Sequence, residues 1–135
     1  MIYLVDANVL SEPTKPTPDS QAIDWLRVNE SEIAVDPIIL GKIRFGIHLL
    51  SRGQRRQRLE RWFDEGVARV LCLHWDGVTG LRWARLLADL RRSGRSVAIK
   101  DSLIAATALV HGLTVVTRNV ADFRTTGVRV LNPFA

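Results

Sequence analysis

The chain has 135 residues, 47% of them apolar, which suits a single domain over residues 1–135 with a buried core. Its formal net charge of +5 permits binding to nucleic acid or to an acidic protein but demonstrates neither. The single cysteine, Cys72, excludes an internal disulfide framework and a zinc site built from several cysteines.

The longest apolar stretch follows Asp101 and is interrupted by a histidine and a glycine, so it is too polar and irregular for a membrane span. The chain begins with neither a basic leader nor a small-residue cleavage site, so no signal peptide is visible. With one cysteine as well, we expect a cytoplasmic protein with no membrane partner.

Short apolar runs alternate with helical patterns in the first half of the chain. We predict strands over residues 2–5 and 33–36, a Pro-rich loop over 11–20, and helices over about 20–28, 37–50 and 55–66. Asp19 or Ser20 is expected to cap the first of these helices. Pro37 begins the second, at a position that proline favours.

The second half continues the alternation. We predict strands over about residues 69–73, 113–117 and 128–131, and helices over about 78–93 and 100–111. Because each strand is a short continuous apolar run, the pattern indicates a parallel sheet covered by helices on both faces. The predicted fold is α/β, with three layers (α/β/α) around a mostly parallel sheet of four to five short strands.

Several polar residues come just after the predicted strands, where the crevice of such a sheet lies. They are Asp6, Asp36, Thr117, Arg118 and Asn119, with Asp122 one turn later and Asp101 at the start of a helix. One acid there is often only a helix cap. Several acids at one edge repel one another unless a charge compensates them, and carboxylates with few other ligands suit Mg²⁺ or Mn²⁺.

Four stretches carry a resemblance to a known family: YLVDANVLSE, PIILGKIRFGI, KDSLIAATALVHGLTVVTRNVADF and VLNPF. Together they resemble the motifs of PIN-domain ribonucleases, specifically the VapC-type toxins of toxin–antitoxin pairs, near the FitB-like branch. The resemblance covers essentially the whole chain. It implies the PIN fold, metal-dependent endoribonuclease activity on RNA (tRNA is one candidate), a VapB-type antitoxin and a homodimer.

The same resemblance implies roles for individual residues. Asp6 and Asp101 correspond to metal-binding acids, and a fourth site position falls at Asn119 or at nearby Asp122. Supporting roles are weaker: they are implied for Asn8 and Thr117 as partners of a carboxylate, Ser11 in ordering a loop, and Arg118 as a phosphate contact or an ion-pair partner. A purely structural role is at least as well supported for each of these four.

Lys42 departs from the family pattern. With about 100° per residue, the polar face of its helix consists of Gly41, Arg44, His48 and Arg52. Lys42 lies about 120° from that face, on a flank that we expect to be apolar, formed by Ile38, Phe45 and Leu49. GKIRFG aligns without gaps with the family motif that carries a glutamate, so Lys42 is expected to face the acidic site.

An ammonium in place of a carboxylate changes the charge of a small site by two units. At 4 Å and an effective dielectric of about 20, one charge pair is worth on the order of 4 kcal/mol before desolvation. Lys42 is therefore expected to compete with a metal ion and to impair nuclease activity. Asp36 is a possible compensating partner for Lys42, six residues away.

Three functions follow from these observations. The first is a Mg²⁺- or Mn²⁺-dependent endoribonuclease toxin, impaired by Lys42. The second is a catalytically silent PIN-fold module that dimerises and binds antitoxin or RNA. The third, a phospho-acceptor receiver domain, fits poorly because such domains need the lysine after the last strand, and here it lies in a helix after the second.

Overall fold

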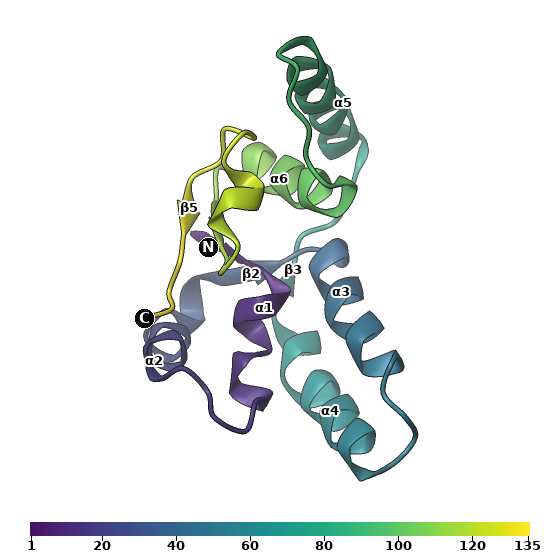
Figure 1. Cartoon of the computed structure of the whole chain (residues 1–135), viewed down its shortest axis with the longest axis vertical. Helices are drawn as coiled ribbons and strands as arrows, with labels where there is room; N and C mark the ends of the chain where they lie inside the picture. Colours follow the sequence, from purple (N-terminus) through teal and green to yellow (C-terminus); the bar gives the residue numbers. More distant parts are fainter.

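The computed structural model describes residues 1–135 and has a five-stranded sheet at its centre (Figure 1). The strands are β1 (Tyr3–Val5), β2 (Ile33–Val35), β3 (Leu71–Cys72), β4 (Thr114–Val116) and β5 (Val130–Leu131). Their order is β3-β2-β1-β4-β5, and every neighbouring pair is parallel. The predicted α/β fold is confirmed, and the sheet is wholly rather than mostly parallel.

Six helices surround the sheet. They are α1 (Ala7–Leu10), α2 (Ser20–Val28), α3 (Pro37–His48), α4 (Gln54–Glu65), α5 (Gly77–Arg92) and α6 (Ile99–His111). In Figure 1, α5 and α6 lie above the sheet and α1 to α4 lie below it, so both sides of the buried strands are covered. None of the helices combines the length and the apolar character that crossing a bilayer requires.

Aspartates cap four of these helices, because a carboxylate oxygen can accept from the free N–H groups of the first turn. Asp6 caps α1, Asp36 caps α3 and Asp76 caps α5, and Asp19, rather than Ser20, caps α2. The predicted loop over residues 11–20 contains a short 3₁₀ helix, Glu12–Thr14. Helix α1 was not predicted, since a single turn is too short to show a periodic pattern.

The core lies between the sheet and the inner faces of the helices. On α3 the buried face consists of Ile39, Ile43 and Ile47. Burial of each such side chain contributes roughly 1.5–3 kcal/mol. The apolar flank beside Lys42 is largely open to solvent, since Phe45 is 61% and Leu49 is 70% exposed. Lys42 therefore sits beside the buried face, at its edge.

Strand β1 is the point at which the strand order reverses, with β2 on one side and β4 on the other. In open parallel sheets this reversal opens a crevice beyond the carboxyl ends of the strands. Val5 is paired with Val116 in the register, so the next residues, Asp6 and Thr117, leave the sheet at the same level. The topology thus brings two parts of the chain together that are far apart in sequence.

Candidate active site

Asp6 is the central residue of the site, and only 1% of its surface is exposed. It follows β1 directly, and its backbone N–H donates to the carbonyl of Val116 at 2.8 Å. Its Oδ1 accepts from the N–H of Ala7 at 2.8 Å, which caps α1, and its Oδ2 accepts from the Thr117 hydroxyl at 2.9 Å. The carboxylate is therefore held by the first residue of α1 and by the residue that follows β4.

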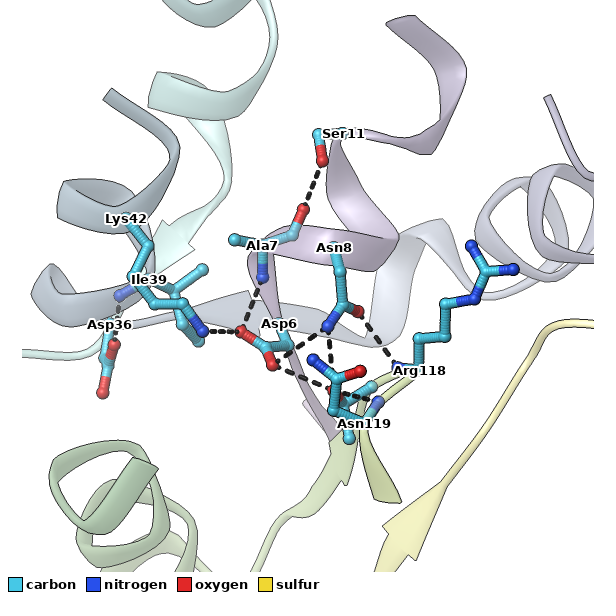
Figure 2. A network of polar contacts seen from close by, with 10 residues as sticks. Asp6, Ala7, Asn8, Ser11, Asp36, Ile39, Lys42, Arg118 and Asn119 are labelled. Carbon is cyan, nitrogen blue, oxygen red and sulfur yellow. Dashed lines mark hydrogen bonds and ion pairs between the residues drawn. The ribbon is translucent and has the colours of Figure 1, made fainter. Parts of the chain in front are cut away.

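Lys42 reaches Asp6 from α3. Its Nζ donates to Asp6 Oδ1 at 2.8 Å, and the lysine side chain is 23% exposed (Figure 2). A helix residue at the edge of the buried face can project over the end of a neighbouring strand, which explains the unusual place of this lysine. Attraction between the charges is offset in part by desolvation of both groups. The side chain of residue 42 therefore lies beside Asp6.

Asn8 and Thr117 connect the two strand ends around Asp6. The amide nitrogen of Asn8 donates to Thr117 Oγ1 at 3.2 Å and lies 3.5 Å from Asp6 Oδ2. Its amide oxygen accepts from the N–H of Arg118 at 3.0 Å. Thr117 Oγ1 also accepts from the N–H of Asn119 at 3.1 Å. These bonds orient the Asp6 carboxylate (Figure 2).

Two of the predicted supporting residues lie further from Asp6. The guanidinium of Arg118 stacks over the ring of Phe134 at 4.5 Å and points away from Asp6 in Figure 2. Ser11 donates its hydroxyl to the carbonyl of Ala7 at 2.7 Å, at the end of α1. Both contacts organise the chain around the site, and neither places a side chain on the central carboxylate.

Asp101 is the third residue of α6 and is partly buried. Burial raises its pKa, and the nearby charges of Asp122 and Asp6 raise it further, while the ammonium of Lys42 lowers it. Asp122 is exposed on the 3₁₀ helix Val120–Phe123. Asn119 instead lines a cleft together with Lys42. Both candidates for the fourth position thus lie near the site: Asp122 is close to Asp101, and Asn119 shares the cleft with Lys42.

Asp36 is not the partner of Lys42, so that expectation is wrong. Its Oδ1 accepts from the N–H of Ile39 at 2.9 Å and its Oδ2 from the Thr107 hydroxyl at 2.7 Å. A capping side chain turns back toward the first turn of its own helix, while Lys42, six residues further along the chain, points to Asp6. Burial raises the pKa of Asp36, and the Asp6 charge adds to this.

A cleft of about 400 Å³ opens beside the site, between α1, α3 and α4. Residues of the site line part of it, and α4 contributes Arg55, Leu59 and Trp62. Further exposed arginines lie before α4 (Arg52) and on α4 (Arg58 and Arg61). Phosphate groups are attracted by such cations, and Arg55 brings one of them to the cleft, which makes the cleft a candidate nucleic-acid surface.

The arrangement of these residues does not fit a divalent cation. Asp6 Oδ1 already accepts from Lys42 and Ala7, and Oδ2 from Thr117. No three or more His, Cys, Asp or Glu side chains are grouped so that they could hold a metal ion. Mg²⁺ and Mn²⁺ need anionic oxygens that are free to coordinate, and here an ammonium occupies one of them.

Two buried polar residues beside the site were not predicted. Glu12 is 3% exposed, accepts from the N–H of Asp19 at 2.8 Å and lies 2.9 Å from the Lys15 ammonium. Both contacts lower its pKa, the N–H of Asp19 most. Thr107 is completely buried on α6. A lone hydroxyl in the apolar run IAATALV was the available signal for Thr107.

Comparison with known proteins agrees with this geometry. Residues 3–128 match the PIN domain family. Plasmid stability protein StbB of Pseudomonas syringae pv. tomato is 33% identical over 98% of this chain and 99% of its own length. VapC ribonuclease Y4jK of Sinorhizobium fredii is 30% identical, with 98% of each chain covered.

The fold is also similar to that of a solved structure. The crystal structure of FitAcB from Neisseria gonorrhoeae contains a chain with a TM-score of 0.88 and 30% identity, with 98% of both chains covered. The family match spans nearly the whole chain, and the relatives align over their full lengths. The chain therefore belongs to the PIN-domain family.

Proposed function

We propose that this protein is the toxin component of a toxin–antitoxin pair, built on the scaffold of a VapC-type endoribonuclease. The full-length similarity to a relative named as a VapC ribonuclease supports this proposal. So does the cleft at the switch point of the sheet, which is lined in part by Arg55. The substrate class is RNA, with tRNA as one candidate, and the partners are a VapB-type antitoxin and a second copy of the chain, in the cytoplasm.

One observation carries the second part of the proposal, which concerns activity. Lys42 Nζ lies 2.8 Å from Asp6 Oδ1, at the position where the family motif has a glutamate. The ion pair gives Asp6 a counter-charge from within the chain. With Lys42 the protein is therefore an impaired nuclease. Binding of Mg²⁺ or Mn²⁺ at this site requires the substitution Lys42→Glu.

The residues around the ion pair of Lys42 and Asp6 have separate roles in the proposed function. Thr117 and Asn8 hold the orientation of the Asp6 carboxylate through hydrogen bonds. Arg55 at the cleft attracts RNA by contacts with phosphate, which predicts binding that weakens steeply with salt. Asp101 and Asp122 keep a local negative charge near residue 42.

A second function is favoured by a specific observation. Both carboxylate oxygens of Asp6 have hydrogen-bond partners, so the site is stable with no ion bound. Such a chain can act as a silent module that binds antitoxin or RNA without cleavage. The two functions differ in what happens when Lys42 is replaced.

The test compares cleavage of structured RNA with Mn²⁺ by the unsubstituted protein and by Lys42→Glu. We expect Lys42→Glu to cleave on the order of a hundredfold faster or more, because about 4 kcal/mol in one charge pair corresponds to about a thousandfold before desolvation, which reduces the effect. Lys42→Glu combined with Asp6→Asn is the control and should be inactive.

Equal cleavage by the chain as written and by Lys42→Glu would show that Lys42 does not block the site. If Lys42→Glu cleaves none of a panel of structured RNAs and tRNAs, the endoribonuclease proposal is wrong and the silent module is supported. Cleavage that persists in the control variant would indicate a contaminating nuclease.

A further inference from the structure

Asp36 is a buried carboxylate that takes no part in the ion pair between Lys42 and Asp6. It is 0% exposed and lies at the end of β2, directly before α3. Burial of a carboxylate is costly unless its oxygens have partners. Asp36 has one on each oxygen: the N–H of Ile39 at 2.9 Å, within α3, and the hydroxyl of Thr107 at 2.7 Å, on α6. The same side chain thus joins two helices.

Thr107 extends this connection to a third element. Its hydroxyl oxygen accepts from Trp75 Nε1 at 3.1 Å, and Trp75 lies in the segment between β3 and α5. Thr107 is completely buried, so these bonds are shielded from water. The start of α3, the middle of α6 and the approach to α5 are held at one point.

A second contact holds α6 close to the site. The rings of Trp75 and Trp83 meet edge to face, with centroids 6.1 Å apart. Trp83 Nε1 donates to Ser102 Oγ at 2.9 Å, and Ser102 is the neighbour of Asp101. The polar contacts therefore fix α6 at Thr107 and again beside its acidic site residue.

Helix α3 carries residue 42 to the site, and α6 carries Asp101. Residue 42 lies six residues beyond Asp36, about 9 Å along the helix axis, so a small tilt at the start of α3 moves it appreciably. We propose that Asp36 is a positioning residue, which fastens α3 to α6 through Thr107 and so fixes where the side chain of residue 42 meets Asp6. This rests on the site proposed above but not on RNA cleavage.

The test measures how well the Lys42 amine is protected in the folded protein. Amine-reactive acylation at low reagent is followed by mass spectrometry, with exposed Lys100 as the internal reference. Asp36→Ser keeps a good helix cap and loses the bond to Thr107. Asp76→Ser is the matched control, because Asp76 caps α5 in the same way, with Thr79 N at 3.0 Å. We expect Lys42 labelling to rise several-fold in Asp36→Ser only.

Equal labelling of Lys42 in the chain as written, Asp36→Ser and Asp76→Ser would overturn the proposal. If Asp36→Ser does not fold, Thr107→Val removes the same bond from α6, and Thr107→Ser retains the hydroxyl. Labelling should rise in Thr107→Val and stay near the original rate in Thr107→Ser; an unchanged rate in Thr107→Val would also overturn the proposal.

Labelling of the unsubstituted protein shows whether the positioning role of Asp36 or the proposed function has failed. If Lys42 is labelled as fast as Lys100 before any substitution, the ion pair with Asp6 is absent, and the account of the blocked site fails with it. If Lys42 is protected in the chain as written and in every folded variant, only the positioning role of Asp36 fails.

Discussion

Lys42 and Asp6 form an ion pair of 2.8 Å between α3 and the end of β1, with the carboxylate almost fully buried. The two residues are 36 positions apart, and only the packing of α3 beside the switch point of the sheet brings them together. The pair joins a helix to the central strand at the point where the family is expected to bind a metal. Its removal therefore has consequences for stability as well as for activity.

Lys42→Met should lower the free energy of unfolding by about 1–3 kcal/mol, because it leaves a buried carboxylate without its counter-charge. We place the cost below that of a fully buried pair, since the lysine is 23% exposed. Urea unfolding at pH 7 measures the change. Lys100→Met removes an exposed lysine on α6 and should change stability by less than about 0.5 kcal/mol. Equal losses in both variants would contradict a structural role of the pair.

Thr117→Val should destabilise the protein by about 1–3 kcal/mol, because it removes a buried hydroxyl that serves several partners. The hydroxyl donates to Asp6 at 2.9 Å and accepts from the N–H of Asn119 at 3.1 Å. Thr117→Ser keeps both bonds and should retain most of the stability. Thermal unfolding of the two variants side by side decides this, and an equally stable Thr117→Val would show that the hydroxyl does not support Asp6.

Glu12→Gln should destabilise the protein at pH 7, and the difference should shrink in acid. The pKa of Glu12 is lowered from its ordinary value of 4.5 by the N–H of Asp19 and by Lys15. A lowered pKa in the folded state contributes stability above the ordinary pKa, and this contribution is lost as the pH falls through the folded value. Unfolding free energies measured between pH 7 and pH 3 should therefore converge. A difference that stays constant over this range would exclude the linkage.

Arg55→Gln should weaken RNA binding, since Arg55 is exposed and lines the cleft beside the site. Loss of one phosphate contact should reduce the slope of log affinity against log salt concentration by about 0.7 for single strands. Filter binding at several salt concentrations gives both quantities. Arg92→Gln, at the end of α5, is the matched control. Equal effects of the two substitutions would show that net charge, and not the cleft, attracts RNA.

The sequence predicted the parts of the fold that follow from local patterns. Alternation of apolar runs and helical periods indicates the parallel sheet, and strand ends place Asp6 and Thr117 at one edge of it. Pro37 and Asp19 mark helix starts through chemistry that acts within one turn. The position of Lys42 in the site follows from its motif and its unusual place on the helix.

The motif places Lys42 near the acids but does not choose among them, because Asp36 lies only six residues away and Asp6 lies 36 away. Two properties of the folded chain decide between them: the cap geometry turns Asp36 toward Ile39, and β1 brings Asp6 beneath α3. The exposure of Phe45 also could not be read from the sequence, since an apolar residue on a helix can be covered by a neighbour or left in solvent.

Calorimetric titration with Mn²⁺ tests the central claim most directly, because it asks whether Lys42 takes the place of the ion. We predict no measurable binding to the chain as written, binding to Lys42→Glu, and loss of that binding when Asp6→Asn is added. Mn²⁺ binding to the chain as written that is as tight as binding to Lys42→Glu would contradict the account.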